Sequence, residues 1–264
     1  MIDSHLHLSD SQFDIDRYNL IDNCLSKNFK SFLEILCSAD DWDKYHLFEK
    51  YADYFYFAFG IHPEYPSHLN DNNLRMLEKY LNIKNAIAVG EIGIDLWYYP
   101  DSIGQQLQLM EAQVDIANRL KKPLIFHIRN PRESNKAYDE FFAFIKTRIK
   151  NSMEIPAVIH SFSGTLEDVS KALDLGFMIG INATLTYPKN QILRDAVKKA
   201  GIKNILTETD SPYLPPQSSR GKRNNPSNIA EIIRKISEIL EIPFKEIEMQ
   251  TEENFKRFTR IFYS

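Results

Sequence analysis

Two hydrophobic periods alternate along this chain almost from one end to the other. Short apolar runs rich in β-branched residues are separated by longer stretches whose apolar residues recur at three- and four-residue steps. The first pattern is typical of buried strands and the second of amphipathic helices. The short runs predict eight strands, at 2–8, 31–37, 55–61, 86–92, 123–128, 157–161, 176–181 and 204–209.

The amphipathic stretches predict helices between these strands. The clearest helix covers 102–120, where one face carries Ile103, Leu107, Met110, Val114 and Ala117. The same pattern predicts further helices at 14–28, 41–53, 70–82, 132–150, 166–175 and 189–200, and a closing pair at 226–240 and 243–262.

Eight strands that alternate with helices predict an α/β fold, a single (β/α)8 barrel (a TIM barrel) over residues 1–264. The active site of such a barrel lies at the C-terminal mouth of the strands. The alternative is an open, doubly wound sheet. That fold usually has a glycine-rich turn after its first strand, and the chain reads SHLHLSD there.

Charge and composition narrow the possible functions. The net charge of −4 argues against a protein that wraps long duplex DNA on a basic face, although local contacts with a few phosphates remain compatible with it. Two cysteines, Cys24 and Cys37, are too few for a disulfide framework. No apolar run is long enough to span a bilayer. We therefore expect a cytoplasmic, monomeric protein that has no membrane partner.

The first predicted strand carries His5 and His7, separated by one residue. Side chains alternate with period two along a strand, so both rings project from the same face. A pair of hydrogen-bonded core histidines is the alternative interpretation. We favour metal chelation, because two titratable rings on one buried face need a partner.

Other titratable residues stand where predicted strands end. They are His62, Glu91, His127, His160 and Asp210, whereas His46 and His68 fall in helical or loop sequence. The C-terminal ends of barrel strands converge on one pocket, so we predict that these strand-end side chains meet.

Six side chains from the first strand and the later strand ends are good metal ligands, which is more than one tetrahedral ion requires. They are His5, His7, Glu91, His127, His160 and Asp210. We therefore predict a site for two divalent ions, Mg²⁺, Mn²⁺ or Zn²⁺, with Glu91 bridging them. Two ions roughly 3.5–4 Å apart suit an in-line displacement at phosphorus by an activated water. One ion is assigned to His5, His7, Glu91 and Asp210, and the other to Glu91, His127 and His160.

Glu91 and Asp210 are also the predicted catalytic residues. Apolar neighbours such as Val89 and Ile92 make an unpaired carboxylate costly at Glu91, and a metal ion is a better partner there than an arginine. For Asp210 the alternative is a salt-bridged surface acid. We favour a metal ligand and proton acceptor, with Glu208 orienting a ligand from outside.

Several segments together resemble the TatD family of metal-dependent deoxyribonucleases over nearly the whole chain. In order, they are DSHLHL, GIHP, VGEIGID, LIFHIR, IHSFSG, LTETDSPYLPP and RGKRNNPSNI. The resemblance implies a barrel phosphodiesterase that uses divalent cations, Mg²⁺ among them, bound by the same six ligands. It also implies DNA hydrolysis, commonly exonucleolytic.

Two departures from the family pattern fall at the predicted mouth. Asn130 stands where the family's His-x-Arg motif usually continues with Asp, and the family's GLDYY-like segment reads GIDLWYY over 93–99. Neither departure touches the predicted ligands, so they put the substrate preference in doubt rather than the chemistry.

Basic and aromatic residues near the mouth predict a nucleic-acid substrate. Arg129 and Arg223 are predicted to contact phosphate, although a solvated basic turn is the alternative for the 220–223 loop. His62 is predicted to contact phosphate or to shuttle a proton, with a structural histidine as the alternative. Cys37 is expected to be a buried, unreactive thiol.

Four aromatic residues follow predicted strands 4 and 6. Core packing is their usual role, but on mouth loops they would stack unpaired bases. DNA ends or single strands fit such a pocket better than continuous duplex, because a base must leave the stack to reach a barrel floor. The four are Trp97, Tyr98, Tyr99 and Phe162.

Two other functions are compatible with parts of this pattern. A barrel amidohydrolase or lactonase acting on a small carbon substrate also uses His-x-His, but it has a bridging lysine where this chain has Glu91. A catalytically inactive barrel that serves as a binding scaffold would have lost ligands, and none of the six is missing here.

Overall fold

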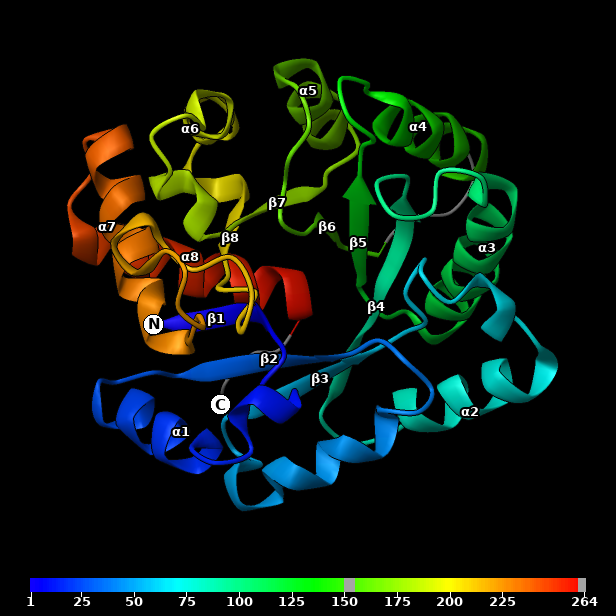
Figure 1. The fold of residues 1–264 in the computed structure, drawn as a ribbon, viewed down its shortest axis with the longest axis horizontal. Coiled ribbons are helices and arrows are strands. Elements are labelled where there is room, and N and C mark those ends of the chain that lie inside the picture. Colours follow the sequence, from blue (N-terminus) through cyan, green and yellow to red (C-terminus); the bar gives the residue numbers. More distant parts are fainter. Residues whose placement is uncertain (150–154, 261–264) are drawn as a thin grey trace.

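All eight predicted strands are present in the computed structural model, which describes residues 1–149 and 155–260. They form one parallel sheet in the order β1 to β8, with each strand beside its neighbour in sequence (Figure 1). The strands are β1 (Ile2–Leu6), β2 (Ser31–Leu36), β3 (Phe55–Phe59), β4 (Ala86–Asp95), β5 (Leu124–Arg129), β6 (Ala157–Ile159), β7 (Met178–Ile181) and β8 (Ile205–Thr207).

The sheet curves into a nearly closed barrel. Just beyond the ends of β8 and β1, the backbone N–H of Asp210 donates to the carbonyl of His5 (2.9 Å) and that of His7 donates to Ser211 (2.8 Å). A doubly wound sheet would have its first strand inside the sheet, with the strand order reversing there. The sequential order therefore confirms the predicted barrel and excludes the open sheet.

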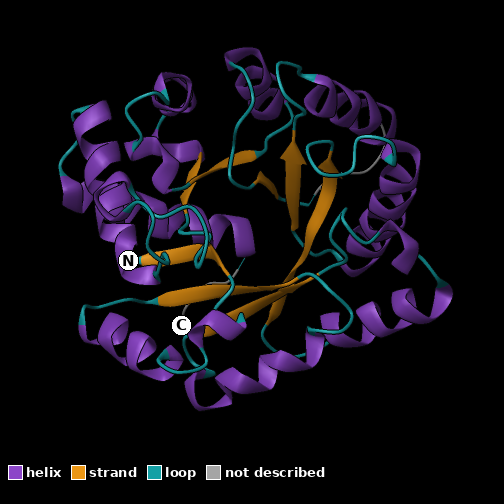
Figure 2. Ribbon diagram, viewed as in Figure 1, coloured by secondary structure: helices purple, strands orange, loops and turns teal. Residues whose placement is uncertain are grey.

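The helices α1 to α7 form a ring outside the strands, and α8 lies across the N-terminal end of the barrel (Figure 2). The helices are α1 (Arg17–Ser26), α2 (Asp71–Leu81), α3 (Ile103–Leu120), α4 (Lys136–Ile149), α5 (Leu166–Asp174), α6 (Gln191–Ala200), α7 (Ile229–Leu240) and α8 (Phe244–Thr259). Residue 150 of the helix predicted over 132–150, and residues 261–262 of that predicted over 243–262, lie outside the described residues. No helix in the described part of the chain combines the length and apolar character needed to cross a membrane.

The helix predicted over 41–53 is a 3₁₀-helix instead, η2 (Trp42–Tyr51). Its aromatic residues Trp42, Tyr45, Phe48 and Tyr51 recur at every third position, which matches the three residues per turn of a 3₁₀-helix. Trp42 and Phe48 are fully buried. The shorter 3₁₀ turns are η1 (Ser11–Phe13), η3 (Pro66–His68), η4 (Ala183–Thr186), η5 (Ile202–Asn204), η6 (Gln217–Ser219) and η7 (Pro226–Asn228).

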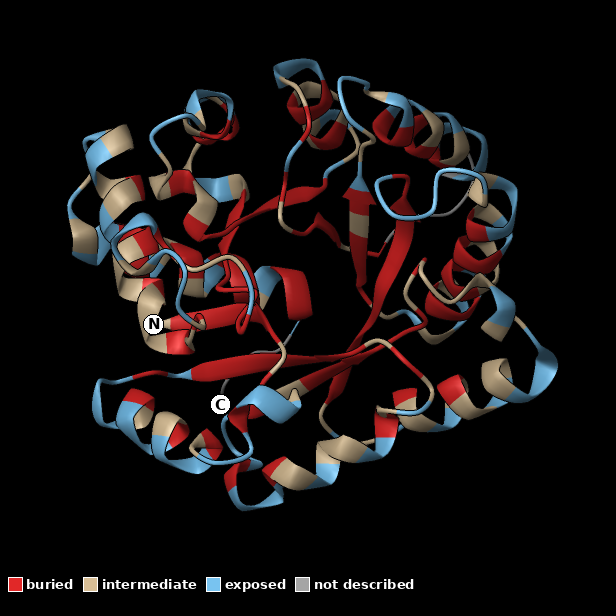
Figure 3. Ribbon diagram, viewed as in Figure 1, coloured by how far each residue is buried: buried red, intermediate tan, exposed pale blue. Residues whose placement is uncertain are grey.

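The strands are buried along most of their length (Figure 3). The buried side chains inside the barrel are apolar at one end and polar at the other. At the N-terminal end of the strands, Ile2 and Leu33 pack with Phe255 and Phe258 of α8, which close the barrel. Beyond this apolar cluster, toward the C-terminal ends of the strands, the buried residues include histidines and carboxylates. The fold therefore places the buried histidines at the C-terminal mouth, above the apolar layer at the N-terminal end of the barrel.

Candidate metal centre

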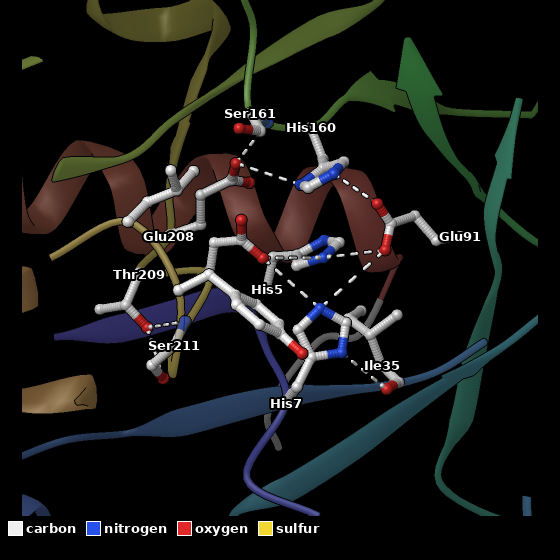
Figure 4. A network of polar contacts seen from close by, with 12 residues as sticks. His5, His7, Ile35, Glu91, His160, Ser161, Glu208, Thr209 and Ser211 are labelled. Carbon is white, nitrogen blue, oxygen red and sulfur yellow. Dashed lines mark hydrogen bonds and ion pairs between the residues drawn. The ribbon is translucent and has the colours of Figure 1, made fainter. Parts of the chain in front are cut away.

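The six predicted ligands meet at the C-terminal mouth. Figure 4 shows four of them, His5, His7, Glu91 and His160, turned toward one another. They come from β1 and the residue after it, from β4 and β5, and from the residues that follow β6 and β8. Glu91 lies at the centre. Its Oε1 is 2.8 Å from Nδ1 of His127 and 2.5 Å from Nε2 of His160.

The second oxygen of Glu91 faces the other pair of histidines. Its Oε2 lies 3.5 Å from Nε2 of His5 and 4.0 Å from Nε2 of His7. Oδ1 of Asp210 lies 3.4 Å from the same nitrogen of His7. One carboxylate thus presents its two oxygens to two separate groups of ligands, which is the arrangement a bridging ligand needs.

Two of the ligand segments have unusual backbone geometry. Asp210 and Ser161, which follows His160, have φ values of 56° and 47°. A non-glycine residue in this left-handed region is strained by roughly 1–2 kcal/mol. Such strain persists only where the surroundings over-determine it, and it is concentrated at functional sites.

Three ligand histidines turn their second ring nitrogen toward an oxygen outside the group. Nδ1 of His7 lies 3.2 Å from the carbonyl of Ile35, and Nε2 of His127 lies 3.3 Å from Oδ2 of Asp95. Nδ1 of His160 lies 3.5 Å from Oε1 of Glu208, within ion-pair distance but without a hydrogen bond. Metal-binding histidines characteristically have such a partner, because it selects the tautomer and orients the ring.

His5 shows that the donor set fits a cation. Its ring is fully buried, and neither of its nitrogens has a hydrogen-bond partner among the described residues. A buried, unsatisfied polar group is destabilising by about 1–3 kcal/mol, and a metal ion would satisfy it. Ligand atoms within 4.8 Å of one another form three groups: His5, His7 and Asp210; His5, His160 and Glu208; and His62, Glu91 and His127.

The sequence profile of a family described as TatD related DNase matches residues 2–260. This chain belongs to that family. It is 32% identical over 273 residues to an uncharacterized metal-dependent hydrolase, BU355, of Buchnera aphidicola, with 99% of each chain covered. It is 27% identical over 248 residues to a second one, YjjV of Escherichia coli, covering 93% of this chain and 92% of the relative.

Solved structures of TatD proteins have the same fold. The crystal structure of YjjV aligns with a TM-score of 0.89 at 25% identity, covering 99% of this chain and 98% of that one. A TatD family hydrolase from Entamoeba histolytica aligns with a TM-score of 0.82 at 22% identity, covering 98% and 97%. This chain is accordingly a metal-dependent hydrolase of the TatD family.

The carboxylates and imidazoles of this TatD site shift one another's pKa values. Burial alone would raise the pKa of Glu91, but the charges of His160 and His5 hold that pKa well below its ordinary value. Burial, together with the nearby charge of His127, lowers the pKa of His62 to about 3. Burial would also lower the pKa of His7, but Asp210 raises it to about 9. Glu91 is therefore ionised and His62 neutral at physiological pH.

His62 lies closer to the ligands than the sequence prediction placed it. Its Nε2 is 4.0 Å from Oε1 of Glu91, and the centroids of its ring and that of His127 are 4.4 Å apart. His62 therefore stands among the atoms that could hold the second ion, in addition to lining the cavity above it.

Asp95 is a site residue that the sequence analysis missed. It is buried, and besides facing His127 it accepts hydrogen bonds from the backbone N–H groups of Trp97 (2.8 Å) and Tyr98 (3.0 Å). The predicted strand ended at residue 92, whereas β4 continues to Asp95. Alternation with period two along 91, 93 and 95 was the available signal, since it places Asp95 on the face that carries Glu91.

A cavity of about 1360 Å³ opens above the metal ligands. Arg129 lines it, but Arg223 does not, because its guanidinium pairs with Asp16 (Nη2–Oδ2 2.5 Å) and lies over the ring of Phe13. Arg220 of the same loop lines the cavity instead.

Two other residues that line the cavity have defined roles in packing. Phe162 is buried, with its ring centroid 5.6 Å from that of Tyr138. Cys37 lines the cavity and is only partly buried, whereas a buried thiol is predicted; desolvation followed by the charge of Glu91 raises the pKa of its thiol well above the ordinary value. The thiol is therefore protonated at neutral pH and a poor nucleophile.

Proposed function

We propose that this TatD-family hydrolase is a deoxyribonuclease that hydrolyses phosphodiester bonds of DNA at the metal centre. The position of Glu91 carries the proposal, because each of its oxygens faces a separate set of imidazoles. Sites for two adjacent cations are typical of enzymes that cleave phosphodiesters. The description of the family as TatD related DNase supports the same substrate.

The ligands divide between two divalent ions, Mg²⁺, Mn²⁺ or Zn²⁺. His5, His7 and Asp210 would hold one ion, and His127, His160 and His62 would hold the other, with Glu91 between them. Bound cations would supply Lewis-acid activation of water and neutralise charge on the phosphate. Asp210 lines the cavity beside His7 and would accept the proton of the attacking water.

Two guanidinium groups at the cavity favour a phosphodiester over a small neutral ester or lactone. Arg129 and Arg220 both line the cavity, and neither has a carboxylate within 4.0 Å in the described ranges, residues 1–149 and 155–260. Unpaired guanidinium groups match the geometry of phosphate oxygens and gain two parallel hydrogen bonds there.

The test is hydrolysis of an end-labelled DNA strand by the metal-loaded protein. Exhaustive chelation should abolish cleavage, and adding back Mg²⁺, Mn²⁺ or Zn²⁺ should restore it. Asp210→Asn should lower turnover by about 10²–10³-fold, with an unchanged circular dichroism spectrum. Cleavage that persists in chelator would refute the metal mechanism. Rapid hydrolysis of lactones with no cleavage of DNA would show that the substrate is a lactone and not DNA.

A further inference from the structure

The end of β5 and the loops after β4 and β5 carry a cluster of exposed aromatic rings and guanidinium groups. We call this cluster the aromatic shelf: Trp97, Tyr98, Arg129 and Arg132. The guanidinium carbon of Arg129 lies 5.4 Å from the ring centroid of Trp97 and 4.8 Å from that of Tyr98. That of Arg132 lies 5.3 Å from Trp97. Trp97 is 41% exposed and Tyr98 62% exposed, so neither ring belongs to the core.

The shelf is held rigidly although its rings are exposed. Asp95 accepts the backbone N–H groups of Trp97 and Tyr98, and the fully buried Gln106 donates from Nε2 to the carbonyls of Asp95 and Tyr99, both at 3.1 Å. A loop fixed in this way binds a ligand without a large ordering penalty.

The shelf is continuous with the cavity of the metal centre. Asp95, Tyr98 and Arg129 all line that cavity, and Asp95 contacts both the shelf loop and His127. Neither Arg129 nor Arg132 has a carboxylate within ion-pair distance among the described residues. An exposed ring with an uncompensated guanidinium beside it offers both a stacking face and a phosphate contact.

Resting on the proposed nuclease function, we propose that the aromatic shelf binds an unpaired nucleobase of the strand whose phosphate occupies the metal centre. The base stacks on the ring of Tyr98, and Arg129 contacts the adjoining phosphate. The ring of Trp97, which also contacts the guanidinium group of Arg129, holds that group in position. Phe162 is excluded from this role because only 3% of its surface is exposed. A base within continuous duplex is already stacked on both faces, so the shelf selects strand ends and single strands.

The experiment compares two uncleaved strands of equal length on the metal-loaded protein: a phosphorothioate oligothymidylate and the same backbone with abasic residues. Binding is followed by the fluorescence of Trp97, since the other tryptophan, Trp42, is fully buried. Stacking contributes roughly 1–3 kcal/mol per base, so the strand that carries bases should bind about 5- to 150-fold more tightly. Tyr98→Ala should lose this preference, and Tyr98→Phe should keep it.

Two controls separate the shelf from general effects of mutation. Tyr54→Ala removes an exposed tyrosine (40%) just before β3, at the opposite end of the barrel, and should leave the preference unchanged. Arg129→Ala should weaken the binding of both strands equally. It should also remove about one phosphate contact, which lowers the slope of the logarithm of the binding constant against the logarithm of salt concentration by roughly 0.7.

The possible outcomes distinguish failure of the shelf from failure of the nuclease function. A protein that cleaves DNA, but whose Tyr98→Ala variant keeps the full preference for bases, would overturn the shelf alone. Absence of measurable binding to either strand would also overturn it. Tyr98-dependent binding by a protein that cleaves no DNA would support the shelf and overturn the nuclease proposal.

Discussion

At the floor of the barrel mouth the predicted metal ligands lie in or just after β1, β4, β5, β6 and β8 and are mostly buried, whereas the aromatic shelf at the rim comes from the end of β5 and the loops after β4 and β5 and is exposed. The floor depends on closure of the whole barrel. The rim depends on local hydrogen bonds from Asp95 and Gln106. We therefore expect mutations in the two regions to have separate effects, and Asp95 contacts both regions.

The largest expected effect comes from the floor. Glu91→Gln removes the charge that faces both groups of imidazoles, and we expect turnover to fall by at least about 10²–10³-fold. Bound metal, measured by elemental analysis, should fall at the same time. Glu167→Gln, whose side chain is 76% exposed on α5, is the matched control. Full metal content and turnover in Glu91→Gln would show that the floor does not bind ions through this carboxylate.

Asp95 gives a sharper separation, because two substitutions affect its contacts differently. Asp95→Asn keeps an oxygen for the N–H groups of Trp97 and Tyr98 but removes the charge beside His127. We expect metal affinity to fall about 10–100-fold while the base preference is retained. Asp95→Ala should lose both. Metal titration and the strand comparison measure the two effects, and a parallel loss in both variants would show that the regions are not separable.

Gly180 tests the contact behind His160. A Cβ atom there would lie 2.3 Å from Oε2 of Glu208, so Gly180→Ala must displace a carboxylate that lies beside His160. We expect about a tenfold loss of metal affinity, with the base preference of the rim unchanged. Gly104→Ala, which meets no atom within 4 Å, is the control. Equal metal affinity in both variants would show that Glu208 does not help to position the metal ligands.

The smallest effects are expected in the loop after β8. Arg220→Ala should weaken DNA binding modestly. The salt dependence of the binding constant should fall by the amount expected for about one phosphate contact. Arg223→Ala should leave binding unchanged and lower the free energy of unfolding by about 1 kcal/mol or less, because its pair with Asp16 is partly exposed. Titrations at several salt concentrations and chemical denaturation measure these changes. A larger binding defect in Arg223→Ala than in Arg220→Ala would reverse the assignment.

The misses of the sequence analysis have physical causes. Asp95 was missed because an apolar run marks the centre of a strand and not its last residues, and β4 runs three residues beyond the predicted end. An α-helix is predicted where the 3₁₀-helix η2 lies, because aromatic residues three apart also fit one face of an α-helix. Arg223 was chosen over Arg220 although nothing in a short basic run shows which cation has an acidic partner.

The sequence by itself determined the barrel and the directions of its key side chains. Alternation of apolar runs with amphipathic stretches specifies strands and helices, and period two on β1 places His5 and His7 on one face. Only the tertiary structure decided which oxygen of Glu91 faces which imidazole, and that Asp95 connects floor and rim. Local backbone geometry sets where a side chain points, whereas distances between residues far apart in the chain depend on how the barrel closes and packs.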